Sequence, residues 1–239
     1  MALTILDIAN GVFSIIFVSI SILIGLTIIS KYFQYKQRTY LLIGLTWIGM
    51  STPWTPSSIS LLTYLLFGIV LRIEILLFIA IFFLPFIQIF WLTVFCVFKG
   101  IKKRKIILGL FSIEGLLFKV YFLLNLFTNP SAIGEFSGTF DMNYKLIVNL
   151  FLFSLLILFI ITGTMLARES LKSEDPEVKL KGKLLFLAFY SFIIGSILDI
   201  FSASSILLLT IARLVLISSG FAFYGGFILP NWMKKIFLR

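Results

Sequence analysis

Long apolar runs limit what this chain can fold into more than any other feature of its sequence. A hydrocarbon core of about 30 Å is crossed by roughly 20 apolar residues in a helix. Because 60% of the 239 residues are hydrophobic and only 13% are charged, the chain has too little polar surface to cover such runs in water. The runs predict transmembrane helices over residues 5–30, 73–98, 106–127, 144–166, 184–201 and 205–229.

One further apolar stretch, residues 40–70, is interrupted by a polar segment that contains Pro53 and Pro56. Two prolines so close together break or sharply kink a helix. We interpret the stretch as one broken span, or as a span plus a re-entrant piece, because a full turn there would carry the basic cluster at 99–105 to the outside. The sequence therefore predicts an all-α membrane protein, a seven-transmembrane-helix bundle that forms a single domain over residues 1–239.

The lysines and arginines set the predicted orientation. Sixteen of the twenty fall on one side of the predicted bundle. They are Lys31, Lys36, Arg38, Lys99, Lys102, Lys103, Arg104, Lys105, Arg168, Lys172, Lys179, Lys181, Lys183, Lys234, Lys235 and Arg239. The positive-inside rule then predicts a cell-membrane protein with its N-terminus outside and its C-terminus in the cytoplasm. The basic inner face would attract anionic lipid headgroups, but basic residues spread over short loops do not form a nucleic-acid-binding stripe.

The chain contains no histidine and a single cysteine, Cys96. This composition excludes a disulfide framework, metal ligation by imidazole and any catalytic triad that depends on histidine. We therefore predict no catalytic residue, no metal site and no cofactor, and expect that the protein is not an enzyme.

Ionisable residues inside predicted spans are candidates for a functional site, because they are costly in lipid and usually face the bundle interior. Four residues qualify: Glu114, Lys119, Asp199 and Arg213. Counting about 1.5 Å per residue places Glu114 and Arg213 near the same depth, close to the midplane. An ion pair between these two is predicted, either as a structural clamp between helices or as part of a ligand or gating site.

A polar vestibule in the outer half of the membrane is the second predicted site. Asp199, Lys119 and Glu74 are placed towards the outer ends of their helices, and irregular backbone near Trp54 is tolerated at that depth when it lines a cavity. The other predicted members are Asp7, Ser51, Thr52, Thr55 and Arg72. The alternatives are that Glu74 is an ordinary interfacial charge, that Lys119 extends outward to water, and that Trp54 belongs to the aromatic belt.

Local signals predict helix contacts and boundaries. Small residues four apart favour close approach of helices. They are Ser21 with Gly25, Ser191 with Gly195, and Ser218 with Ala222 and Gly226. Asp175 followed by Pro176 is typical of a helix start. The turn formers and acids of residues 128–143 predict an exposed outer loop.

Three stretches resemble a known group of proteins: residues 47–56, 167–177 and 213–232. They are similar to archaeal seven-helix membrane proteins and to the seven-helix sensor regions that precede histidine kinase modules in some prokaryotes. The resemblance implies a membrane sensor. Since the chain ends at Arg239 without a transmitter domain, such a sensor is expected to act on a separate cytoplasmic signalling protein.

Two functions follow from these observations. The first is a sensor or receptor-like module in which the outer-half polar site responds to a small ligand of unknown identity. The alternative is a small transporter or channel with a permeation site at Glu114 and Arg213. A lipid-modifying enzyme that uses Glu114 and Lys119 is a third possibility, without a recognisable catalytic arrangement.

Overall fold

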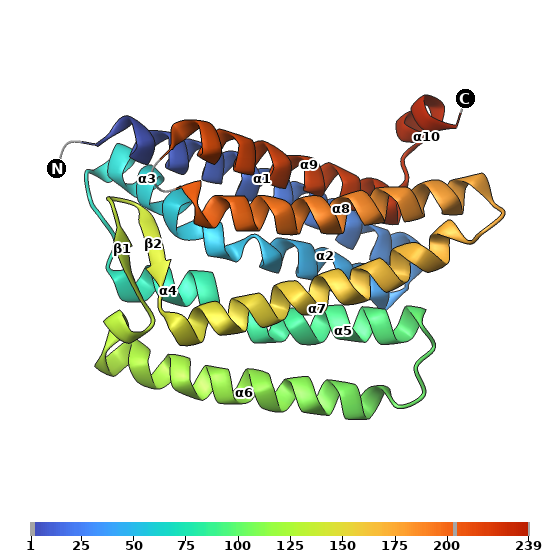
Figure 1. The fold of residues 1–239 in the computed structure, drawn as a ribbon, viewed down its shortest axis with the longest axis horizontal. Coiled ribbons are helices and arrows are strands. Elements are labelled where there is room, and N and C mark those ends of the chain that lie inside the picture. Colours follow the sequence, from blue (N-terminus) through green and yellow to red (C-terminus); the bar gives the residue numbers. More distant parts are fainter. Residues whose placement is uncertain (1–2, 203–204, 239) are drawn as a thin grey trace.

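The computed structural model describes residues 3–202 and 205–238. Its helices are α1 (Ile5–Tyr35), α2 (Arg38–Met50), the short 3-10 helix η1 (Thr52–Trp54), α3 (Thr55–Phe67), α4 (Ile73–Ile81), α5 (Leu84–Phe98), α6 (Arg104–Thr128), the short 3-10 helix η2 (Pro130–Ala132), α7 (Leu146–Leu171), α8 (Pro176–Ile200), α9 (Ile206–Ile228) and α10 (Asn231–Phe237). Strands β1 (Gly134–Ser137) and β2 (Asp141–Tyr144) pair as an antiparallel hairpin. The long helices lie side by side as a bundle (Figure 1).

Among the described residues, six helical segments are long and apolar enough to cross a membrane. They are α1, the α4–α5 pair, α6, α7, α8 and α9. Large apolar side chains such as Leu110, Leu117 and Leu124 of α6 are exposed on the outside of the bundle, as contact with lipid requires. The prediction of a multi-pass, helical membrane protein is confirmed.

The predicted break near Pro53 is confirmed, and it divides the stretch into α2 and α3 with η1 between them. Each of these two helices has 13 residues, too few to cross a hydrocarbon core alone. The missing N–H of Pro53 leaves the Gly49 carbonyl without its helical donor, and the Thr52 hydroxyl lies 2.9 Å from this oxygen. The Thr52 hydroxyl also lies 2.8 Å from Ala80 O of α4. The second of these bonds ties η1 to α4.

A second break, which we did not predict, divides the span 73–98. Helix α4 ends at Ile81 and α5 begins at Leu84, with Phe82 and Phe83 between them. Pro85 lies in the first turn of α5. Proline has no N–H and its ring collides with the carbonyl four residues earlier, so hydrogen bonding is interrupted here, although Phe82 and Phe83 keep helical torsions and Ile73–Phe98 remains one span.

The two ends of the bundle differ in charge. The α1–α2, α5–α6 and α7–α8 connections and α10 gather at one end, whereas the N-terminus and the β hairpin lie at the other (Figure 1). The basic clusters found in the sequence therefore share one end, apart from Arg239, which lies outside the described residues. We call this the basic end. Two ion pairs join elements there, Lys99 with Glu169 and Lys234 with Glu177.

The segment 128–143 is exposed at several residues, among them Thr128, Ser131 and Glu135, as its composition predicts, but it is folded and not a free loop. Its β hairpin folds back over the end of the bundle, and the side chains of Ile133 and Phe140 are fully buried. At the hairpin tip, the Thr139 N–H donates to Asp7 Oδ1 at 3.1 Å, and Ser57 Oγ donates to the Phe140 carbonyl at 3.0 Å. These bonds attach the hairpin to α1 and α3, so the segment forms a cap.

The predicted close contacts are confirmed at Gly25, Gly195 and Gly226, whereas Ser218 is exposed and the prediction of a helix contact there is wrong. Gly25 of α1 packs directly against Gly44 of α2, since a Cβ on Gly25 would lie 2.8 Å from the Gly44 carbonyl oxygen. A Cβ on Gly195 would lie 3.2 Å from the Ala212 carbonyl, and one on Gly226 would lie 2.6 Å from the Leu185 side chain. Small residues thus let α1 approach α2 and α8 approach α9.

Aromatic side chains fill the centre of the bundle. Trp47 stacks on Phe223 with ring centroids 4.2 Å apart, and Phe159 packs edge-on against Phe189 at 4.9 Å. The indole of Trp91 donates to Thr162 Oγ1 at 2.7 Å, which satisfies its N–H in the core. This aromatic core is close-packed and lies between the hairpin-capped end and the basic end.

Candidate functional site

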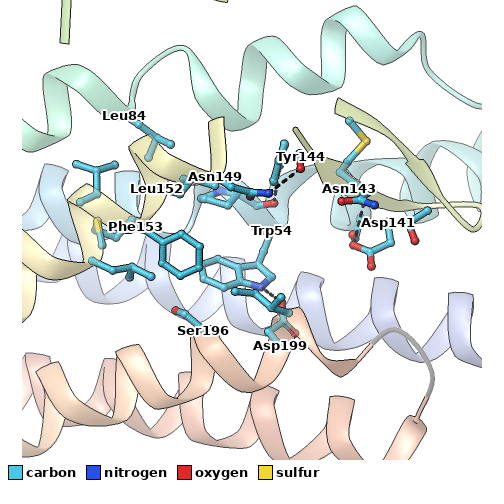
Figure 2. Close-up of a pocket in the computed structure, with 18 of the residues that line it drawn as sticks. Trp54, Leu84, Asp141, Asn143, Tyr144, Asn149, Leu152, Phe153, Ser196 and Asp199 are labelled. Atoms are coloured by element: carbon cyan, nitrogen blue, oxygen red, sulfur yellow. Dashed lines mark hydrogen bonds between the residues drawn. The ribbon is translucent and has the colours of Figure 1, made fainter. Parts of the chain in front are cut away.

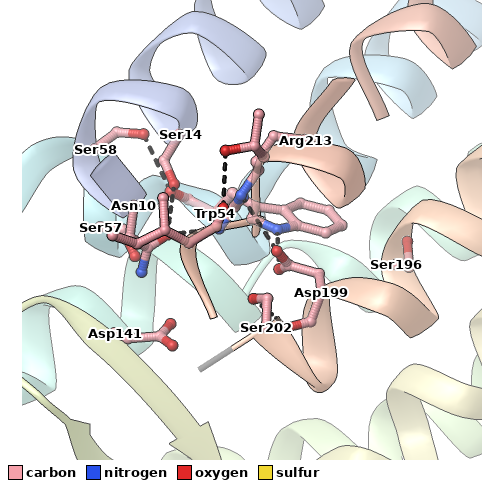
Figure 3. Close-up of polar contacts among 12 residues, drawn as sticks. Asn10, Ser14, Trp54, Ser57, Ser58, Asp141, Ser196, Asp199, Ser202 and Arg213 are labelled. Atoms are coloured by element: carbon pink, nitrogen blue, oxygen red, sulfur yellow. Dashed lines mark hydrogen bonds and ion pairs between the residues drawn. The ribbon is translucent and has the colours of Figure 1, made fainter. Parts of the chain in front are cut away.

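An ion pair joins two neighbouring helices beneath the hairpin. Arg213 of α9 is only 2% exposed, and its Nε lies 3.2 Å from Oδ1 of Asp199 in α8. Its Nη2 donates to Oδ1 of Asn10 in α1 at 2.6 Å. The indole N–H of Trp54 in η1 donates to Asp199 Oδ2 at 2.7 Å. Side chains from four elements therefore meet at this point (Figure 3).

The direction of helical side chains explains why Arg213 reaches Asp199. Helical side chains lean towards the N-terminal end of their own helix. Arg213 lies two turns into α9, so its side chain extends back towards the point where α9 begins and α8 ends. A buried guanidinium in this environment needs a carboxylate partner, and Asp199 in the last turn of α8 supplies it.

Part of this network has no hydrogen-bond partner. Within the described residues, Arg213 Nη1 is buried without a hydrogen-bond partner, whereas Arg213 Nε and Asp199 Oδ1 are buried and face each other at 3.2 Å in the ion pair. Buried polar atoms in native proteins are nearly always paired. The group of this network without a partner is thus a donor, Arg213 Nη1, while both carboxylate oxygens of Asp199 face a donor.

A cavity of about 320 Å³ lies beside this network, between the hairpin, η1, α7 and α8 (Figure 2). Its polar lining is Ser57, Ser137, Asp141, Asn143, Tyr144, Asn149, Ser196 and Asp199, with the indole of Trp54 at the centre. Its apolar lining is Met50, Pro53, Leu84, Met142, Leu152, Phe153, Leu155, Leu156, Phe192 and Ile200. This size is at the lower end of the range for small-molecule sites, and the combination of an apolar wall with a few polar groups is typical of them.

Asp141 of β2 places a second carboxylate at the cavity. Burial raises the pKa of its carboxyl above the ordinary value, and the negative charge of Asp199 raises it further. A hydrogen bond from the Met142 N–H, 2.9 Å from Asp141 Oδ1, and the charge of Arg213 act in the opposite direction. Asp141 is therefore close enough to the ion pair to respond to its charge.

Replacement of this residue, Asp141→Asn, is expected to leave the protein at least as stable as the wild type at neutral pH. Because the folded state binds the Asp141 proton more tightly than the unfolded chain, the free energy of unfolding falls as pH rises from 3.8 through the raised pKa. Asparagine carries no charge and avoids this loss. Thermal melting in detergent across this pH range tests the prediction.

The difference between the two proteins should shrink below pH 3.8, where both are uncharged at this position. Glu135→Gln is a matched control, because Glu135 lies on the same hairpin but is exposed and paired with Lys145. An Asp141→Asn protein that melts well below the wild type at neutral pH would show that the ionised carboxylate stabilises the fold.

The predicted ion pair between Glu114 and Arg213 is wrong. Glu114 Oε2 accepts from Gln88 Nε2 at 3.0 Å and its Oε1 accepts from Ser154 Oγ at 2.9 Å, so Glu114 joins α6 to α5 and α7. Helix α6 packs on α5, whereas α9 packs on α8 and α1. Similar depth was not sufficient for pairing, because the two helices are not neighbours and the Arg213 side chain points away from the midplane.

The other predicted members of the vestibule divide into two groups. Asp199 and Trp54 both lie at the cavity. Lys119 places its Nζ 3.3 Å from the ring centre of Phe86 and does not line the cavity, and Glu74 pairs with Arg72 on the exposed rim. The hydroxyls of Ser51, Thr52 and Thr55 bind backbone carbonyls at the helix break, and Asp7 caps α1 and binds the hairpin.

Sequence reasoning missed most of the polar residues of this site, among them Asn10, Asp141 and Asn149. Asn10 could have been found as an amide in an otherwise apolar span, with Ser14 one turn further along the same helix. Asp141 and Asn149 had no comparable signal. Their place depends on the hairpin folding back over the bundle, which composition alone does not predict.

Comparison with protein-family models, with curated proteins and with solved structures finds no match to this chain.

Proposed function

We propose that this protein is a multi-pass membrane sensor or receptor-like module, with its ligand site in the cavity at the hairpin end. The observation that carries the proposal is the junction of α1, η1, α8 and α9 at the Asp199–Arg213 ion pair beside that cavity. A ligand that changes the charge or hydrogen bonding of Asp199 acts on all four elements at once. Helices α8 and α9 then continue to the basic end, where a partner can detect their movement.

We also propose how the chain crosses the membrane. The segment α2–η1–α3 packs along α1 and is taken as a seventh, broken span. The basic end faces the cytoplasm by the positive-inside rule, so the hairpin cap and the cavity face outward. Seven spans place the N-terminus outside the cell membrane and the C-terminus inside. Anionic lipid headgroups then lie against the basic end.

Thiol labelling of intact cells tests this orientation. A Lys103→Cys variant in a Cys96→Ala background is expected to react with impermeant thiol reagents only after the membrane is opened, because residue 103 lies at the basic end. Ser131→Cys, in the capped segment at the opposite end, is the matched control and should react in intact cells. The reverse pattern would invert the topology.

The competing function is a small transporter or channel. The aromatic core opposes it, because nearly fully buried rings such as Trp47, Phe189 and Phe223 lie between the cavity and the basic end. Phe189 and Phe223 are each ten residues from Asp199 and Arg213 along their helices, about 15 Å nearer the basic end. A permeation site built on Glu114 and Arg213 is not proposed, since these residues belong to separate clusters.

The likeness to seven-helix sensor regions of prokaryotes favours the same function and points to a cytoplasmic signalling protein as the partner. The proposal assigns no catalytic role to the cavity.

The sensor function predicts that a change of charge at Asp141 alters the spacing of the loops at the basic end, which spin-label distance measurements in liposomes can detect. Steady cation uptake by the same liposomes, stopped by Asp141→Asn, would favour the transporter instead.

A further inference from the structure

The charge of the cavity lining narrows the kind of ligand it can take. Two carboxylates, Asp141 and Asp199, line the cavity, and no lysine or arginine in the part of the chain that the structure describes does. Arg213 lies behind Asp199 and is 2% exposed, so its charge is directed at the carboxylate and not at the cavity. With both carboxylates ionised and one guanidinium present, the site has a net charge of minus one. One positive charge from a ligand would neutralise it.

The hydrogen-bonding groups at the cavity favour a donor over an acceptor. Asp199 Oδ1 is buried and faces Arg213 Nε at 3.2 Å in the ion pair, so Arg213 already occupies this atom. The carboxylate of Asp141 accepts from the Met142 N–H and forms a side-chain hydrogen bond with Asn10, and it has further lone pairs. The Trp54 indole N–H, a donor, is already used by Asp199. A ligand that brings N–H groups would therefore satisfy the remaining lone pairs of the carboxylates, whereas an anion would meet the carboxylates with like charge.

The remaining walls match an apolar group next to that cation. Leu84, Leu152 and Phe153 lie on the side of the cavity away from Asp141 (Figure 2). The ring of Trp54 lies at the centre, beside Asp199, and adds apolar surface there. At about 320 Å³ the space suits a small amphipathic molecule and is too small for a whole lipid.

We propose that the cavity binds a small organic ammonium ion with an apolar tail, its N–H groups between Asp141 and Asp199 and its tail between α5 and α7. This inference rests on the proposed function, because it names the ligand class of the same site. The ammonium ion neutralises the excess negative charge next to the Asp199–Arg213 pair. The apolar tail replaces water in the part of the cavity that Leu84, Leu152 and Phe153 line.

Binding of phenethylammonium to the purified full-length protein tests the proposal. We expect it to bind and to raise the melting temperature, and to bind at least about tenfold more tightly than the neutral 2-phenylethanol or the anionic 3-phenylpropionate. Methylammonium, which has the charge without the tail, should bind more weakly than phenethylammonium. Isothermal titration calorimetry in detergent, with buffer-and-detergent blanks, measures these affinities.

Two variants separate a binding role from a structural one. Asp141→Asn should weaken phenethylammonium binding about tenfold or more without lowering the melting temperature of the unliganded protein. Glu135→Gln, the exposed carboxylate of the same hairpin, should bind like the wild type. Equal affinity for the neutral or anionic analogue, or unchanged affinity in Asp141→Asn, would overturn the ammonium assignment. Either result would reject the ammonium ligand without rejecting the sensor function. The sensor function is tested by the loop-spacing measurement, which uses no ligand.

Discussion

Replacing Asp199 by alanine is expected to lower the free energy of unfolding by about 3–5 kcal/mol. The substitution leaves the guanidinium of Arg213, which is 2% exposed, without its ion-pair carboxylate and with Asn10 as its remaining hydrogen-bond acceptor. An unpaired buried charge is much more costly than the loss of an exposed ion pair. Denaturation of the purified protein in mixed micelles, followed by circular dichroism, measures the change.

A second substitution identifies the cause of that loss. Adding Arg213→Met to Asp199→Ala removes the unpaired charge and should recover most of the lost stability, since apolar residues of similar size can replace a buried ion pair. Glu135→Gln, which breaks the exposed pair with Lys145, should leave the unfolding curve unchanged. If the double variant were as unstable as Asp199→Ala alone, the loss would come from packing or from the Trp54 hydrogen bond, and not from the charge.

A second large loss of stability is expected for Gly44→Ala, at the close contact between α1 and α2. A Cβ on Gly44 would lie 2.4 Å from the Gly25 carbonyl oxygen and 2.6 Å from Ile29 Cγ1. Backbone atoms cannot move aside as a flexible side chain can, so Gly44→Ala must push the two helices apart. We expect a loss of about 1–3 kcal/mol or more, measured by the same denaturation experiment.

Gly109→Ala is the matched control for this prediction. Gly109 is also a helical glycine, but a Cβ there would have no other atom within 4 Å. Since alanine favours a helix by up to about 1 kcal/mol over glycine, this variant should be unchanged or slightly more stable. Equal effects of the two substitutions would mean that the contact between Gly25 and Gly44 does not limit the helix separation.

The sequence predicts those parts of the fold that depend on local pattern. Apolar length predicts the spans, and Pro53 and Pro56 predict the broken helix, because missing N–H groups act on the nearest turn. Asp175 accepts from the Glu177 N–H at 2.8 Å at the start of α8, as expected for the residue that precedes Pro176. Each of these signals involves residues within a few positions of one another.

The residues of the site depend on which helices are neighbours, and the sequence does not show this. Glu114 and Arg213 lie at comparable depths along their helices, but one faces α5 and α7 and the other faces α8 and α1. The hairpin brings Asp141 back over the bundle, although residues 128–143 have the composition of an exposed loop. Tertiary packing determines both the contacts of Glu114 and the position of the hairpin. The sequence therefore predicts the correct end of the molecule for Asp199 and Trp54, but not the residues that they contact there.

The spacing of two loops at the basic end tests the coupling between the cavity and the cytoplasmic face most directly. Spin labels at Lys102 and Lys179, both exposed, would be introduced as cysteines in a Cys96→Ala background and measured by double electron–electron resonance in liposomes. We expect Asp141→Asn, which removes one negative charge beside the Asp199–Arg213 pair, to shift the distance between the labels by about 1–2 Å, as small helix movements do. Glu135→Gln should cause no shift. Identical distance distributions for the wild type and Asp141→Asn would contradict the proposal that the site communicates with the basic end.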